Sequence, residues 1–150
     1  VIIIGFRKDL NITFSFPEAE IDDETKYIPL KTVIEKRVDE KYFFSERAVA
    51  GMMKKRESMN KGRAQNINKP CNTVGAHLAK VSLNSTDPVL MEGERYRRFT
   101  PREVARIQSF PDDFFFDCSM GDAFKQIGNA VPPLLAYGVA KTVLNTFEEE

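Results

Sequence analysis

The chain has 150 residues, of which 42% are apolar and 29% charged, and its 22 basic and 22 acidic side chains give a formal net charge of zero. A chain of this length and composition can bury a core, which excludes collagen, a disordered tail and a disulfide scaffold. No apolar run approaches the roughly 18 residues of a membrane helix, and the opening run lacks the flanks of a signal peptide. The two cysteines, Cys71 and Cys118, suit a reducing compartment.

The charges are segregated along the chain although their sum is zero. Acidic side chains gather at residues 18–24 and 112–122, and basic side chains gather at 50–69 and 94–106. A neutral protein with two basic segments can hold a polyanion on one face, but a solvated surface of mixed sign is the ordinary alternative. Charge alone therefore leaves nucleic-acid binding open.

The N-terminal half is expected to contain few regular elements. The apolar run at residues 1–4 predicts a strand buried on both faces, as in a parallel sheet. Because parallel strands need crossover connections, this strand predicts a larger α/β domain upstream. The alternative is a strand of a small mixed sheet. Residues 13–16 predict a short strand, and residues 30–38 a short helix. Ser45 predicts the N-cap of a helix that runs to about residue 60, whose apolar face is either core or a recognition surface.

The last third has the clearest helix signals. Residues 100–103 (Thr-Pro-Arg-Glu) form a capping box with Pro at the first helical position, which predicts a helix that stops before Pro111. A second short helix is expected up to Ile127, with Gly128 as its left-handed cap, and Pro132 opens a terminal helix. Apolar residues recur at every fourth position of the terminal segment and predict a core-facing amphipathic helix: Val131, Leu135, Val139, Val143 and Phe147.

Two long stretches carry a family resemblance. Residues 98–114 (RFTPREVARIQSFPDDF) resemble the ninth sequence motif of the DNA cytosine-5 methyltransferases, and residues 123–133 (AFKQIGNAVPP) resemble the tenth. Both stand in the family's order and spacing. Residues 4–7 also resemble the end of the eighth motif, whereas Ser109 stands where the family often has Gly.

The resemblance implies a mixed α/β architecture in three parts. Residues 1–16 would end the Rossmann-like catalytic domain with a strand, residues 17–97 would form a small irregular target recognition domain, and residues 98–150 would carry helices back to the catalytic domain. The family's recognition domain typically contains a Thr-Val or Thr-Leu pair, which Thr73 and Val74 match.

The resemblance also implies an activity for the intact protein. The family transfers the methyl group of S-adenosyl-L-methionine to carbon 5 of a cytosine that is flipped out of duplex DNA. Its cysteine nucleophile, Glu motif and Gly-rich cofactor loop lie before the counterpart of residue 1, so no catalytic residue is assigned here. The chain alone is expected to be inactive and to need the N-terminal catalytic region. The alternatives are a recognition subunit of a split methyltransferase and a non-catalytic DNA-binding module.

Site residues follow from the same resemblance. The family's tenth motif lines the methionine end of the cofactor, which assigns Asn129 and Ala130 to S-adenosyl-L-methionine. Thr73 and Val74 are expected near DNA. Further basic side chains are expected to neutralise phosphates, a contact that positions a protein without reading sequence: Arg63, Lys69, Arg97 and Arg98. The polar side chains of the ninth motif are expected to be scaffold first and phosphate contacts second.

Three further side chains are of types that can act as nucleophiles or metal ligands. Cys71 follows Pro70, as in the family's nucleophile loop, but it lies in the recognition segment and is predicted to be non-catalytic; Cys118 is predicted to be inert. His77 is the only histidine and is expected to be a loop residue or a DNA contact, because the sequence has no cluster of metal ligands.

Partners and location are also expected from the resemblance. The expected partner is duplex DNA, and no membrane association is expected. The expected location is the bacterial cytoplasm, at the nucleoid, and the expected system is restriction-modification. The apolar face of the last helix predicts that the chain alone self-associates.

Overall fold

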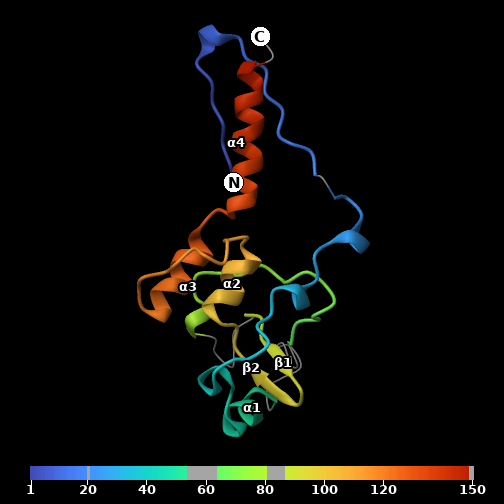
Figure 1. Cartoon of the computed structure of the whole chain (residues 1–150), viewed down its shortest axis with the longest axis vertical. Coiled ribbons are helices and arrows are strands. Elements are labelled where there is room, and N and C mark those ends of the chain that lie inside the picture. Colours follow the sequence, from blue (N-terminus) through green and yellow to red (C-terminus); the bar gives the residue numbers. More distant parts are fainter. Residues whose placement is uncertain (20, 54–63, 81–86, 149–150) are drawn as a thin grey trace.

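The computed structural model describes residues 1–19, 21–53, 64–80 and 87–148 (Figure 1). Its α-helices are α1 (Glu46–Met53), α2 (Pro101–Ile107), α3 (Met120–Asn129) and α4 (Pro133–Glu148), and its strands are β1 (Leu90–Glu92) and β2 (Arg95–Arg97). Short 3-10 turns lie at Lys8–Leu10, Glu24–Lys26, Leu30–Thr32, Glu40–Tyr42 and Leu78–Lys80. The mixed α/β class predicted from the sequence is confirmed.

The chain forms a lobe from which one long helix projects. Figure 1 shows α1, α2, α3 and the β1–β2 hairpin in the lobe, while α4 extends away from it between two extended N-terminal segments. Phe6 joins these segments to the helix, since its ring centroid lies 5.7 Å from that of Phe14 and 5.9 Å from that of Phe147. The division at residues 16/17 and 97/98 stays a prediction.

The N-terminal segment differs from the predicted strands. Residues 1–4 and 13–16 are extended, but they belong to no strand in the described part of the chain. Ile2 and Ile4 are half-buried, whereas Val1 and Ile3 are exposed. A strand buried on both faces needs neighbours that cover both faces, and here only alternate side chains are covered.

The core of the lobe joins residues that lie far apart in the sequence. Val104 and Ala105 of α2 are fully buried, and they share one cluster with the following side chains: Leu30, Val74, Leu78, Val89, Leu90, Tyr96, Phe99, Phe124 and Ile127. Burial of such apolar surface is the main favourable term in folding. The ninth-motif helix is therefore packed into the same core as the segment predicted to recognise DNA.

The β1–β2 hairpin pairs along β2 with a segment from earlier in the chain. Its strands pair antiparallel with Leu90 opposite Arg97, and its two-residue turn contains Gly93 at φ 59°, a left-handed conformation that favours glycine. The segment 42–44 runs along β2, where the amide of Phe44 donates to the Tyr96 carbonyl at 2.9 Å.

Two helix predictions need correction, and one is confirmed. Ser45 caps α1, since its Oγ accepts from the Ala48 amide at 3.3 Å; the predicted end near residue 60 lies outside the described residues. The helix predicted at 30–38 is only the turn Leu30–Thr32, because the Glu35 amide donates to the Glu103 carboxylate instead of a helical carbonyl. Gly128 is not a left-handed cap, since α3 continues to Asn129.

Helix α4 is covered only in part. Val139 and Val143 are half-buried, but Leu135 and Phe147 are each 49% exposed, so the predicted core-facing side is open along much of its length. That α4 packs on a further surface, or mediates self-association, stays a prediction. None of the helices in the described ranges is long and apolar enough to cross a membrane.

Candidate functional site

The tenth-motif helix lies directly against the loop that follows the Thr-Val pair. A Cβ added at Gly128 would be 2.4 Å from the amide nitrogen of Ala76 and 2.4 Å from the carbonyl carbon of Gly75. Real Cβ atoms do not approach backbone so closely, so only glycine permits this contact. Gly128 is therefore a packing residue, which explains why it stands inside α3 rather than as its cap.

This contact brings the two predicted site segments together. The pair Thr73 and Val74 precedes the loop that touches Gly128, and Asn129 and Ala130 follow Gly128 directly. Thr73 is exposed, but Val74 is 6% exposed and belongs to the core. Val74 therefore anchors the loop, and of the pair only Thr73 faces solvent. Asn129 is exposed at the end of α3, and Ala130 is half-buried.

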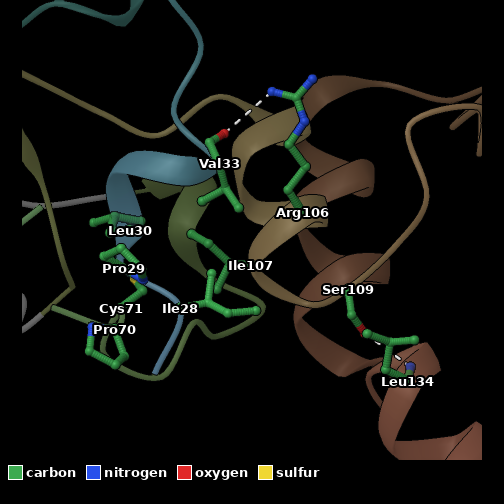
Figure 2. Close-up of a pocket in the computed structure, with 10 residues that line it drawn as sticks. All are labelled: Ile28, Pro29, Leu30, Val33, Pro70, Cys71, Arg106, Ile107, Ser109 and Leu134. Carbon is green, nitrogen blue, oxygen red and sulfur yellow. Dashed lines mark hydrogen bonds between the residues drawn. The ribbon is translucent and has the colours of Figure 1, made fainter. Parts of the chain in front are cut away.

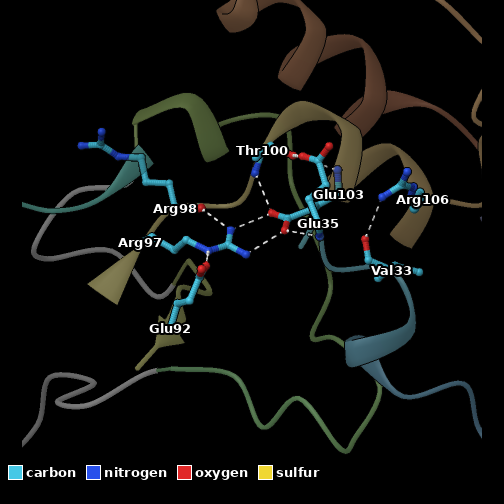
Figure 3. Close-up of polar contacts among 8 residues, drawn as sticks. All are labelled: Val33, Glu35, Glu92, Arg97, Arg98, Thr100, Glu103 and Arg106. Carbon is cyan, nitrogen blue, oxygen red and sulfur yellow. Dashed lines mark hydrogen bonds and ion pairs between the residues drawn. The ribbon is translucent and has the colours of Figure 1, made fainter. Parts of the chain in front are cut away.

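A buried carboxylate of α2 joins this helix to the segment predicted to recognise DNA (Figure 3). Glu103 has 0% exposure, and its two oxygens accept from both terminal nitrogens of Arg97 at 2.8 Å. They also accept from the Thr100 amide at 2.9 Å and from the Glu35 amide at 3.0 Å. Because the amide of Thr100 and its hydroxyl both engage Glu103, the predicted capping box is confirmed.

The same network corrects the placement of Arg97. Its side chain is 1% exposed, and its Nε donates to Glu92 at 2.7 Å. Burial by itself lowers the pKa of Arg97, but the hydrogen bonds and charges of Glu103 and Glu92 outweigh burial and raise it. The guanidinium thus stays charged inside the lobe and does not lie on the surface where a phosphate contact was expected.

The carboxylates that surround Arg97 could not be predicted from the sequence. Glu92, which accepts from Arg97, and Glu35, whose amide donates to Glu103, belong to no recognisable motif. The only sequence signal is the excess of arginine before residue 100, because a buried arginine needs a carboxylate partner.

Arg98 points the opposite way from Arg97 (Figure 3), as neighbouring residues of an extended chain do. Its guanidinium carbon lies 4.7 Å from the ring centroid of Phe44, a cation–π contact. Its Nε is buried and has no hydrogen-bond partner among the described residues. Arg95 stacks similarly on Phe43, at 4.2 Å. Arg98 is therefore held in place by an aromatic ring while its hydrogen-bonding capacity is not saturated.

The other basic candidates are less informative. Lys69 is exposed, and its backbone holds the turn at Leu30, whose amide donates to the Lys69 carbonyl at 2.9 Å. Arg63 lies outside the described residues.

Other polar side chains of the ninth motif bind within the lobe. Arg106 donates to Asp112, with Nε 2.7 Å from Oδ1, and this hydrogen bond lowers the pKa of the Asp112 carboxyl. Arg106 also donates to the Val33 carbonyl at 3.3 Å, and Arg102 donates to the Phe114 carbonyl at 2.8 Å. These contacts agree with the expected scaffold role.

Cys71 lines an apolar cavity of about 340 Å³ between the turn at Leu30 and the end of α2 (Figure 2). Burial raises the pKa of its thiol to about 11, so the thiolate that a nucleophile requires is disfavoured at neutral pH. Cys118 is exposed. His77 Nε2 lies 3.1 Å from Asp87 Oδ1, and the described residues contain no group of three or more side chains that could hold a metal.

The chain belongs to the C-5 cytosine-specific DNA methylase family, whose family model matches residues 1–145. The resemblance drawn from the two motifs is thus confirmed. The relatives are named as type II methyltransferases. M.NgoPII of Neisseria gonorrhoeae is 33% identical, and the match covers 99% of this chain and 50% of M.NgoPII. M.FnuDI of Fusobacterium nucleatum is 30% identical, and the match covers 100% of this chain and 51% of M.FnuDI. The chain therefore spans about half the length of these relatives.

A solved structure shows the same fold. The methyltransferase EhMeth of Entamoeba histolytica superposes with a TM-score of 0.61 over 81% of this chain and 42% of its own, at 14% sequence identity. The likeness supports the interpretation of the chain as part of a methyltransferase fold.

Proposed function

We propose that this chain supplies the DNA recognition lobe and part of the S-adenosyl-L-methionine site of a DNA cytosine-5 methyltransferase. The intact protein would transfer a methyl group to carbon 5 of a flipped cytosine, with the nucleophile and the Gly-rich cofactor loop on a catalytic region outside these 150 residues. The contact of Gly128 with the loop after Thr73 carries the proposal, because it joins a recognition segment to the tenth motif of the matched family.

The DNA side of the proposal uses Thr73 and three basic residues. Thr73 is the solvent-facing member of its pair, and Arg98 is half-buried, with its guanidinium stacked on the Phe44 ring. Arg98, Lys69 and Arg63 would neutralise phosphates, which positions the duplex without reading its sequence. Arg97 is left out because its charge is already paired with Glu103 and Glu92.

The cofactor side of the proposal uses Asn129 and Ala130. Within the described residues the side-chain amide of Asn129 is exposed and makes no hydrogen bond, so its donors and acceptor are available. Ala130, which follows directly, is half-buried and has a small side chain. An available carboxamide next to a small residue fits the polar methionine end of S-adenosyl-L-methionine, which when bound supplies the methyl group.

A transfer assay tests the proposal. The purified chain is incubated with cytosine-containing duplex DNA and S-adenosyl-L-methionine labelled in the methyl group, alone and together with the N-terminal catalytic region of the same protein. We expect no transfer from the chain alone and transfer from the mixture. Transfer by the chain alone would contradict the absence of a nucleophile. A folded mixture that binds DNA but transfers nothing would favour a non-catalytic DNA-binding module.

A further inference from the structure

The turn between α3 and α4 is held at both ends by two consecutive residues at the end of α2. At its start, Gln108 Nε2 donates to the Ile127 carbonyl at 3.1 Å. At its end, Ser109 Oγ accepts from the Leu134 amide at 3.0 Å, a contact drawn in Figure 2. Among the described residues, these are the side-chain hydrogen bonds that reach residues 127–134.

Ser109 supplies the N-cap of a helix to which it does not belong. Helix α4 begins at Pro133, directly after Pro132, and neither proline has an amide hydrogen, so Leu134 has the first amide N–H of the helix. The first helical hydrogen bond runs from the Ala136 amide to the Pro132 carbonyl at 3.0 Å, and it leaves the Leu134 amide unpaired within the helix. The Ser109 hydroxyl satisfies that amide and fixes where α4 starts.

The backbone of Ser109 indicates that its side chain serves this contact. Its φ is 62°, in the left-handed region that favours glycine, so the serine here is more strained than a glycine would be. A glycine would relieve the strain, but it has no hydroxyl to offer Leu134.

The residues enclosed by these two contacts include the proposed cofactor residues. Asn129 and Ala130 lie between Ile127 and Leu134, in a segment that closes with two prolines. A short turn fixed at both ends has few backbone conformations, and holding a binding group in its bound geometry improves affinity by reducing the entropy lost on binding.

We infer that Gln108 and Ser109 are positioning residues for S-adenosyl-L-methionine, which hold the turn so that Asn129 and Ala130 meet the cofactor. The inference rests on the proposed function, which assigns those two residues to the cofactor. It gives the ninth motif a second role, since Glu103 of the same helix holds the recognition segment.

The test uses the intact protein and the variant Ser109→Gly, which removes the hydroxyl and relieves the left-handed strain. We expect the KM for S-adenosyl-L-methionine to rise about fivefold, the effect of one typical hydrogen bond, while kcat and the KM for DNA change less than about twofold. The Tm is expected to stay equal or rise. Gln108→Met, which keeps the length of the side chain and removes its donor, is expected to raise the same KM.

The matched control is Asn11→Gly. Asn11 is also left-handed, with φ 48°, so the change places a glycine at a left-handed position away from the turn, and every kinetic constant is expected to stay the same.

The outcomes separate this inference from the function on which it rests. The inference is overturned if the wild-type protein methylates DNA and Ser109→Gly leaves the KM for S-adenosyl-L-methionine unchanged, or raises both KM values together with a lower Tm. A wild-type protein that neither binds the cofactor in a calorimeter nor transfers methyl groups refutes the proposed function itself.

Discussion

The replacement of Gly128 by alanine tests the junction between α3 and the loop at Gly75. The new Cβ would lie 2.4 Å from backbone atoms of Gly75 and Ala76, whereas ordinary contacts begin near 3.4 Å, so one backbone segment must move by about an ångström. Backbone, unlike the end of a flexible side chain, cannot rotate away. The movement would disturb Phe124 and Ile127, side chains of the same helix that are buried in the core.

The expected magnitude follows from two opposing effects. Overpacking of a tight contact costs about 3 kcal/mol at its upper end, and alanine regains about 1 kcal/mol of helix propensity over glycine. The net loss for Gly128→Ala is therefore about 2 kcal/mol, or a Tm lower by about 4–8 °C for a chain of this size.

Urea unfolding of wild type and variants measures the effect. Gly138→Ala in α4 is the matched control, because a Cβ at Gly138 meets nothing within 4 Å, and it should stabilise the chain by about 0.5–1 kcal/mol. If Gly128→Ala were as stable as Gly138→Ala, the close packing of α3 on the loop at Gly75 would be refuted.

Further predictions concern Arg97, Arg98 and the two cysteines. Arg97→Ala leaves Glu103 buried without its partner and should cost about 3–5 kcal/mol in urea unfolding; a loss under 1 kcal/mol would contradict the buried pair. Arg98→Ala should change stability by less than about 1 kcal/mol, yet lower the salt slope of DNA binding by about 1, and an unchanged slope would exclude a phosphate contact. At pH 8 iodoacetamide should label exposed Cys118 before Cys71, because the Cys71 pKa of about 11 suppresses its thiolate. The variant Cys71→Ser should keep most of the methyl transfer by the intact protein. Preferential labelling of Cys71, or loss of transfer by a folded variant, would contradict the assignment of Cys71 as non-catalytic.

Local signals in the sequence predicted local structure well. The capping box at Thr100 and the N-cap at Ser45 depend on contacts within one turn, so the residue types alone indicate them. The family and the mixed α/β class were also predictable, because the two motifs are long and specific.

The errors arose where distant segments meet. Residues 30–38 have a pattern compatible with a helix, but Glu35 donates to Glu103, 68 positions away, and the helix stops after one turn. Gly128 was assigned a conformational role from its position near a helix end, whereas its actual role depends on the backbone of Gly75. Arg97 was counted with Arg98 as a surface base, since sequence does not reveal which of two adjacent side chains faces the core.

Mass spectrometry of nucleosides tests the central claim most directly. DNA is isolated from a host without methylation of its own that expresses the intact protein, and it is digested to nucleosides. The proposed function predicts 5-methyldeoxycytidine, which is absent from a host expressing the protein without residues 17–97. Methyl groups found only on an amino nitrogen, or no methylated cytosine despite a folded and DNA-bound protein, would contradict it.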